Sequence, residues 1–449
     1  MTAVSNRRPP GPSPRFLIGN FPLFRRDPLA VFTRWAREFG DIFYYRAGWI
    51  HVYFLNHPDL IELALVSQSQ NFAKDKVIQN SRWFLGKGLL TSEGSEWRQQ
   101  RRLCQPAFHR ERLTSYAKTM SVYAEEMLST WQNNEIRDIH QEMMQLTMRI
   151  VAKVLFSVEV KEVTERVAGS LNVLMRHTSG GRMILPPMLR HFPLPALIRV
   201  KQAVRELDEI VNRIIRRRRE TREDTGDLLS MLIAARDEDG SGMTDRQLRD
   251  EIMTFLLAGH ETTAVSLSWT WYLLSQHPEV ELKLRQELDC VVGGRTPQLE
   301  DLARLTYTDK VVKESMRLYP PAWSLARAAT KETEIGGYLL PIGANVVMSP
   351  WIMHRDPRFY DRPEQFDPDR WTGGLSQRLP RFAYFPFGGG SRVCIGASFA
   401  MMEATLLVAT IAQRSQLRML PGHPVAPLPS ITLRPKHGMC MSIQRTGRE

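Results

Sequence analysis

A cysteine follows a glycine-rich loop in the stretch FPFGGGSRVCIGASFA, residues 385–400. Apolar residues behind it recur at roughly helical spacing, so the pattern predicts that Cys394 lies near the N-terminus of a helix. A thiolate is favoured there because the exposed N–H groups and the helix dipole stabilise negative charge. The surrounding glycines remove side-chain bulk, and Arg392 adds a fixed positive charge. One soft anionic ligand, an open backbone and a nearby cation indicate a haem that is held by cysteine.

Six positions of this stretch have the spacing of a known signature: Phe387, Gly388, Gly390, Arg392, Cys394 and Gly396. The run resembles the haem-binding signature of the cytochrome P-450 family, in which haem iron is held by a Cys thiolate. Two other interpretations of a glycine loop fail on the residues. No Lys-Ser/Thr follows, as a phosphate-binding loop requires, and Val393 stands where a dinucleotide fingerprint needs its third glycine. The resemblance therefore implies haem b, with Cys394 as the axial ligand of its iron.

The longest helical pattern, residues 245–276, loses its apolar character at the run AGHETT. Burying an acid and hydroxyl groups in mid-helix costs several kcal/mol unless hydrogen bonds satisfy them, so the run requires a reason. Ala258 and Gly259 would leave a groove with room for a diatomic ligand. We also expect the Thr262 hydroxyl to hydrogen-bond back to the Ala258 carbonyl.

The run AGHETT also resembles the family's oxygen-activation segment, with every position filled. The resemblance implies that Thr262 and Glu261 deliver the two protons needed when iron-bound dioxygen is split. Relatives that use peroxide directly typically lack this acid–alcohol pair. The pair therefore favours a monooxygenase over two alternatives, a haem-thiolate isomerase or peroxygenase and a haem sensor without catalysis.

Cations and an indole are placed where the resemblance implies contacts with the haem propionates. Trp97 and Arg101 are four residues apart, so on a helix they share one face and could both donate hydrogen bonds. This pair is similar to the family's pattern for the helix that clasps the propionates. Arg327 fits a further propionate contact. His354 either reaches a propionate or has a plain capping role, and the sequence leaves both open.

Three residues resemble the family's structural ExxR arrangement. Glu314 and Arg317 are three residues apart on one predicted helix, and Arg370 in FDPDRW matches the arginine that the family supplies from a downstream loop. The resemblance implies that this set locks the loop under the haem and takes no part in catalysis.

The residues give less information about the substrate than about the cofactor. The resemblance implies a lipid-like substrate, a fatty acid or a terpenoid, in a pocket of apolar side chains. The segment 178–195, rich in Gly, Pro and apolar residues, would either line a substrate entrance, touch a membrane surface or be a buried linker. The candidate pocket residues are Phe84, Leu85, Phe255, Trp323, Leu325 and Ile431.

The expected fold is mainly α-helical with small β-sheets, and the resemblance implies the cytochrome P-450 fold. The haem would be buried between the long central helix and the helix that follows the cysteine. We expect a single domain over residues 1–449, with residues 1–14 as an extended, proline-rich lead-in. Local patterns predict a helix over 28–39, two strands joined by a turn at Ala47-Gly48, and two C-terminal strands around a turn at 436–438.

Composition narrows the setting of the protein. Four widely spread cysteines without a CxxC pair argue against a disulfide framework or a zinc site and indicate a reducing compartment. No apolar run approaches the ~20 residues that a membrane-spanning helix needs, and the N-terminus lacks a signal-peptide core. We therefore expect a cytoplasmic monomer, and in the resembled family these features imply a bacterial-type member. The net charge of +12 comes from dispersed arginines without a recognition motif, which argues against nucleic acid as a partner.

Electrons for the reaction must come from another protein, because no flavin or iron–sulfur segment follows the C-terminal strands. The resemblance places a basic surface near the predicted helix that carries Trp97. Its arginines would attract an acidic ferredoxin or flavodoxin-type donor. They are Arg98, Arg102, Arg110 and Arg112.

Overall fold

The structure is a computed structural model that describes most of the chain. The predicted entrance segment 178–195 lies outside the described residues except for its last position. The chain divides into two compact units, Met1–Asn80 with Met316–Cys394 and Ser81–Ser315 with Ile395–Glu449. The described ranges are 8–24, 27–157, 166–171, 173–174, 195–236 and 240–446, without the side chains of residues 24 and 110–113.

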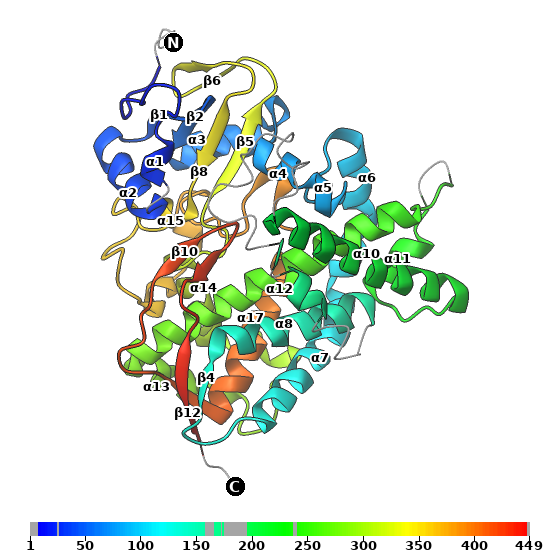
Figure 1. The fold of residues 1–449 in the computed structure, drawn as a ribbon. Coiled ribbons are helices and arrows are strands. Elements are labelled where there is room, and N and C mark those ends of the chain that lie inside the picture. The colour runs from blue at the N-terminus through cyan, green and yellow to red at the C-terminus, as the bar shows by residue number, and fades with distance from the viewer. Residues whose placement is uncertain are drawn as a thin grey trace. The chain divides into compact units, whose positions relative to one another are not determined.

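A five-stranded sheet in the order β1-β2-β8-β5-β3 organises the first unit (Figure 1). The antiparallel hairpin of β1 and β2 turns at Gly48, as predicted, and β8 lies parallel to β2. β5 pairs antiparallel with both β8 and β3. The strands are β1 (Ile42–Ala47), β2 (Ile50–Leu55), β3 (Phe72–Lys74), β5 (Leu325–Ala329) and β8 (Asn345–Met348).

The two faces of this sheet are covered differently. On one face lies α2 (Pro28–Phe39), which has the bounds that the sequence predicts and begins at an Asp27 cap. Phe32 of α2 packs on Phe54, which stacks on Phe43 at a centroid distance of 4.7 Å. The other face packs against segments that include Phe382 and Phe385, just ahead of the glycine loop. The sheet thus supports the chain segment that leads to Cys394.

The remaining elements of the first unit are short. β6 and β7 form a separate antiparallel hairpin. The elements are α1 (Phe21–Phe24), α3 (Pro58–Glu62), α4 (Lys76–Asn80), β6 (Thr333–Ile335), β7 (Tyr338–Leu340), α15 (Pro350–Met353) and α16 (Leu375–Arg378).

The second unit is built on α12 (Asp245–Gln276), which begins at the predicted capping box of Thr244 and Gln247. α8 and α17 pack along it (Figure 1). At Gly259 a side chain would lie 3.1 Å from a methyl group of Val151 in α8. This glycine therefore allows the two helices to approach closely, which differs from the predicted groove for a ligand.

Other helices complete the second unit, and α14 crosses from it into the first. They are α5 (Arg82–Leu85), α6 (Gly94–Cys104), α7 (Arg110–Ser129), α8 (Ile139–Phe156), α10 (Pro195–Thr221), α11 (Leu228–Ala234), α13 (Pro278–Val291), α14 (Thr306–Leu318) and α17 (Ala397–Arg414).

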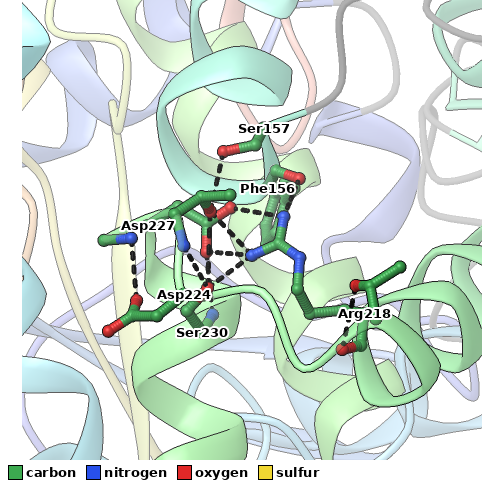
Figure 2. A network of polar contacts seen from close by, with 9 residues as sticks. Phe156, Ser157, Arg218, Asp224, Asp227 and Ser230 are labelled. Atoms are coloured by element: carbon green, nitrogen blue, oxygen red, sulfur yellow. Dashed lines mark hydrogen bonds and ion pairs between the residues drawn. The ribbon is translucent and has the colours of Figure 1, made fainter.

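A buried arginine joins α8, α10 and α11. Figure 2 shows the Arg218 guanidinium, from α10, between the Phe156 carbonyl and the Asp227 carboxylate. Both Asp227 oxygens accept from it at 2.9 Å, and Asp227 also caps α11 by accepting from the Ser230 N–H. Because the carboxylate binds a helix start and a cation at once, its pKa is lowered even though burial alone would raise it.

The C-terminal strands exist but do not form the predicted hairpin. β11 (Leu433–Pro435) pairs with β10 (Pro427–Pro429), whereas β12 (Cys440–Arg445) pairs with β4 (Ile136–Asp138) and β9 (Ser415–Met419). The physical reason is that β12 already has a neighbour on each side, so it has no free edge for β11.

The architecture is mainly α-helical with small sheets, which confirms the predicted class. Among the described residues, no helix has the length and apolarity that crossing a membrane requires. The single-domain assignment stays a prediction.

Candidate active site

The glycine loop presents the Cys394 thiol at an exposed position. The Cys394 N–H donates to the Phe387 carbonyl at 3.0 Å, and this bond closes the loop. Gly388 has a φ of +71°, and a side chain there would meet only a Leu325 methyl at 3.6 Å, so the backbone is open at this point. Glycine is required at position 390 for a different reason, because a side chain there would overlap the Leu65 carbonyl oxygen. α17 begins at Ala397, so Cys394 precedes a helix start as predicted.

His354 holds the start of the cysteine segment. The imidazole is fully buried, and its Nε2 accepts the Phe385 N–H at 2.9 Å. Burial and the neighbouring cations Arg317 and Arg355 hold its pKa well below the usual value, so the ring is neutral. The structure thus gives the imidazole a structural contact within the loop, and its contact with a propionate stays a prediction.

Two arginines of the predicted ExxR set bind the backbone of one loop. Arg317, fully buried, donates to the carbonyls of His354 at 2.8 Å and Gln365 at 3.0 Å. Arg370 donates to the Asp361 carbonyl at 2.7 Å and also reaches Gln365. Glu314 is fully buried on the same helix as Arg317. The arrangement supports the structural role that the resemblance implies.

The two other cations expected at the propionates lie in the first unit and are half-buried. Arg327 belongs to β5 and donates to the Ala326 carbonyl at 2.8 Å. Arg392 lies two residues before Cys394 in the short helix Gly390–Arg392. Their contact with propionates stays a prediction.

The centre of α12 has a narrow open face. Residues 250–271 are all buried except Ala258, which is exposed, and Gly259 and Thr262, which are half-buried. Ala258 and Thr262 are one turn apart and therefore share a face. The Thr262 hydroxyl donates to the Ala258 carbonyl at 2.8 Å, as predicted. A small residue and a hydroxyl thus form an opening in a helix that is otherwise covered by protein.

The acid beside this opening is tied to the C-terminal hairpin. Glu261 is 1% exposed, and its Oε1 accepts from Arg434 Nε at 2.5 Å and from the Thr432 hydroxyl. Arg434 lies on β11 and was not among the residues singled out in the sequence. A buried carboxylate demands a cation, but only the fold shows which arginine supplies it.

His260 is a buried core residue whose polar groups are hydrogen-bonded. Its Nδ1 lies 2.6 Å from the Leu256 carbonyl, and its own carbonyl accepts from the Thr147 hydroxyl of α8. Burial lowers the pKa of its imidazole, so the ring is neutral and donates to that carbonyl.

Several candidate pocket residues turn out to be packing residues. Phe84 and Leu85 are each 1% exposed, so they have no free surface for a ligand. Phe255 packs against Phe108 at a centroid distance of 5.6 Å. Trp323 stacks with Phe32 in the cluster on the α2 face of the sheet. An apolar residue type cannot by itself distinguish a pocket wall from a core.

Three pocket candidates keep accessible surface: Trp323, which is half-buried, Leu325 at the start of β5 and Ile431 in the turn between β10 and β11. Leu325 is half-buried and lies beside Gly388, and Ile431 is 36% exposed.

Trp97 and Arg101 of α6 line one hollow of about 360 Å³, which agrees with their predicted common face. Both side chains are half-buried. The hollow is strongly basic because it also includes two exposed arginines. The other residues lining it are Arg98, Arg102, Gln105, Pro106 and His109.

Each unit carries polar groups of the kinds that contact a haem. The first unit offers an exposed thiol on an open glycine loop, and the second offers an apolar opening with a hydroxyl and a basic hollow with an indole. These are the groups that an iron ligand, a dioxygen-sized ligand and two propionates need.

Comparison with known proteins decides the family. The model of the family described as Cytochrome P450 matches residues 9–440. The chain belongs to the cytochrome P450 family. Cyclooctatin synthase from Streptomyces melanosporofaciens is 40% identical over 93% of this chain and 91% of its own length. Pentalenene oxygenase from Streptomyces avermitilis is 34% identical over 94% of each chain.

Solved structures of cytochrome P450 proteins are similar to this structure. The structure of the retinoic acid-bound cyanobacterial CYP120A1 matches 98% of this chain with a TM-score of 0.87 and 27% identity. The heme domain of cytochrome P450DA matches with a TM-score of 0.89 and 26% identity. The predicted cytochrome P-450 fold is therefore confirmed. As a member of this family the protein holds haem b and is a monooxygenase that acts on an apolar organic substrate.

Proposed function

We propose that the exposed Cys394 thiolate is the iron ligand and that the opening at Ala258 and Thr262 receives dioxygen. The observation that carries this assignment is the exposure pattern of α12, in which one small residue and one hydroxyl interrupt a run of buried positions. When bound, the haem supplies the binding and reduction of dioxygen. The protein's part is to fix the thiolate, shape a dry opening and supply protons.

Protons reach the opening through the Thr262 hydroxyl, whose hydrogen is held on the Ala258 carbonyl. Turning that O–H toward the ligand breaks a single hydrogen bond, so the hydroxyl can serve as a donor without disturbing the rest of α12. Glu261 can resupply the proton only when it leaves Arg434, because that ion pair holds its Oε1 against the hairpin. We therefore assign Arg434 as a positioning residue for the acid.

The propionates are held by Trp97 and Arg101 of α6, which line one hollow. Arg327 and Arg392 remain further candidates for this task. Arginine suits this task because its planar guanidinium binds carboxylates with two parallel hydrogen bonds.

The substrate is a terpenoid. Support comes from the relatives, which include cyclooctat-9-en-7-ol 5-monooxygenase, 37% identical over 92% of this chain, and pentalenene oxygenase. The accessible pocket candidates Leu325 and Ile431 are apolar and suit such a molecule. A spectral-shift screen of terpenes, steroids and fatty acids tests this choice. Binding of fatty acids alone would contradict it.

The electron donor is an acidic ferredoxin or flavodoxin that docks at α6. Arg98 and Arg102 are exposed there, while the side chains of Arg110 and Arg112 lie outside the described residues. Reversing both charges with R98E and R102E should slow reduction at low salt and flatten its salt dependence. The matched control is R216E with R219E on α10, also exposed. Equal rates in both double variants would count against the docking site.

One spectrum tests the ligand assignment. The reduced protein with carbon monoxide should give the absorption of a thiolate-ligated haem, and C394S should lose that absorption. The control C290S removes an exposed cysteine elsewhere and should leave the spectrum unchanged. A thiolate-type spectrum in C394S would overturn the assignment.

A further inference from the structure

Four large apolar side chains stand in solvent on two loop tips of the first unit. We refer to them as the tip patch: Phe16 is 89% exposed, Leu17 71%, Ile18 49% and Trp49 63%. Single exposed apolar residues are ordinary on protein surfaces, but contiguous ones mark interaction sites. The question is whether these four form one surface.

Backbone hydrogen bonds fix the two tips side by side. The first tip is a closed loop in which the N–H groups of Arg15 and Gly19 each donate to the other residue's carbonyl, at 3.2 and 3.0 Å. The second is the turn between β1 and β2, and its Gly48 N–H donates to the Ile18 carbonyl at 3.2 Å. A side chain at Gly19 would lie 2.5 Å from the Arg46 carbonyl oxygen, so this close approach requires glycine. The two tips that carry these four exposed side chains therefore adjoin each other.

The conformation of Leu17 makes the patch costly for folding. Its φ of +61° lies in the left-handed region, where a Cβ atom crowds the carbonyl oxygen. Glycine or asparagine would fit this turn with less strain and without exposing an apolar side chain. Folding alone therefore gives no reason for leucine at the tip.

Cations border the apolar tips. Arg15 is exposed and directly precedes Phe16, and Arg8 is exposed with its guanidinium 5.0 Å from the Tyr44 ring. Arg46 is half-buried and donates to the Gly48 carbonyl of the second tip. Aromatic and aliphatic tips with a cationic border match the apolar zone and the anionic headgroups of a lipid surface.

The size of the patch argues against a second copy of the chain as the occupant. From typical areas of such side chains it exposes on the order of 500 Å². A specific protein interface needs about 800 Å² from each partner. Two projecting loop tips insert between lipid headgroups without needing a matching flat surface.

We propose that the tip patch docks the protein on an anionic lipid surface, with Phe16, Leu17 and Trp49 entering the headgroup region. This inference does not depend on the proposed chemistry, because none of these residues belongs to the candidate active site. It assigns the first unit a second task besides carrying Cys394.

The test uses the full-length, haem-loaded protein and vesicles of phosphatidylcholine with or without phosphatidylglycerol. Flotation should recover the protein with the anionic vesicles, and its Trp fluorescence should shift to the blue and be quenched by brominated lipid. The variant F16S/L17S/W49S should lose at least about tenfold in vesicle partitioning, and W49F alone should remove most of the fluorescence change. R15E should reduce the preference for anionic lipid.

A matched control removes three exposed apolar residues of the second unit, V122S/I136S/L282S, and should partition like the wild type. Circular dichroism of each variant checks that it is folded. Failure of the wild type to bind vesicles, equal loss in both triple variants, or a dimer in light scattering that only the tip variant dissolves would each overturn the proposal.

Discussion

The loop ahead of the cysteine is held by buried cations, whereas the helices α12 and α17 contain buried acids. In the first unit Arg317 is fully buried and the Arg355 side chain is 9% exposed, and each donates to backbone carbonyls. In the second unit Glu251, Glu261 and Glu403 are each at most 1% exposed. The difference matters because arginine cannot readily give up its charge, while a carboxyl group can.

The three buried acids are stabilised in two different ways. Glu261 pairs with Arg434 and keeps a cation beside it. For Glu251 and Glu403, burial raises the pKa to about 8, so both are largely protonated at neutral pH. By contrast, burial lowers the pKa of Arg355 only to about 10, which leaves it charged. The charge of the arginines that hold the loop is therefore constant across physiological pH. The protonation of Glu251 and Glu403 in the helices changes with pH.

The largest effect is expected from breaking the cation-held loop. In R317M the carbonyls of His354 and Pro363 lose the guanidinium that donates to them, and the Gln365 carbonyl keeps only the longer bond from Arg370. Because removing a buried charge leaves its partners unsatisfied, the loss should be about 3–5 kcal/mol in stability. Thermal unfolding and haem content measure this effect. The control R362M replaces an exposed arginine of the same loop and should unfold like the wild type.

Breaking the ion pair between Glu261 and Arg434 should reduce the free energy of unfolding somewhat less, and a second substitution should restore part of it. R434M leaves the Glu261 carboxylate buried without its cation, at an expected cost of about 3 kcal/mol. The double variant E261Q/R434M should recover part of that loss, because it buries no unpaired charge. Urea unfolding of the four proteins in a double-mutant cycle gives the coupling. Strictly additive losses would show that the two residues do not act together.

The protonated acid predicts a pH dependence. Glu403 has an ordinary pKa of 4.5 when unfolded and about 8 when folded. Between these values the folded state holds a proton that the unfolded state has lost, so stability falls as pH rises through this window. E403Q removes the contribution of Glu403 to this slope, while Glu251 keeps its own. The free energy of unfolding of E403Q should therefore fall about 3 kcal/mol less than that of the wild type on going from pH 5 to pH 7.5.

Thermal unfolding across that pH range measures the slope. The exposed acid of E279Q serves as the control and should leave it unchanged. Parallel pH profiles for E403Q and the wild type would mean that Glu403 is ionised in the folded protein.

The smallest free-energy effect, and the most specific, is expected at the opening of α12. T262V removes the hydroxyl on the open face, and product formed per electron pair consumed should fall at least about tenfold, or about 1.4 kcal/mol. T262S should restore coupling. T263V, at the neighbouring buried threonine, should leave coupling nearly unchanged. An equal loss in T262V and T263V would remove the distinction between the open and buried faces.

Much of this could be predicted from the sequence where the determinants are local. The ends of α12 and the Thr262–Ala258 bond follow from residues three or four apart, which a helix always brings together. The glycine loop likewise has its spacing in the chain, so its resemblance to the cytochrome P-450 signature needed no tertiary information. The same locality explains why α2 has its predicted bounds.

Long-range burial and pairing could not be predicted in this way. Arg434 lies 173 residues from Glu261, and nothing in its own neighbourhood indicates that partner. The rings of Phe84 and Trp323 are as apolar as any pocket wall, and only packing showed that Phe84 is buried and that Trp323 packs against a core cluster. The sequence left two roles open for His354, and only the fold showed that its imidazole is buried and accepts the Phe385 N–H.

The sequence by itself determined the family and the residue types that the family shares, and it singled out Cys394 as the proposed ligand, because these depend on spacing within short segments. Tertiary structure alone decided which of those side chains have open surface and which charge faces which. Exposure and pairing arise where segments distant in the chain pack together, so the same threonine, histidine or phenylalanine can lie in a site or in a core.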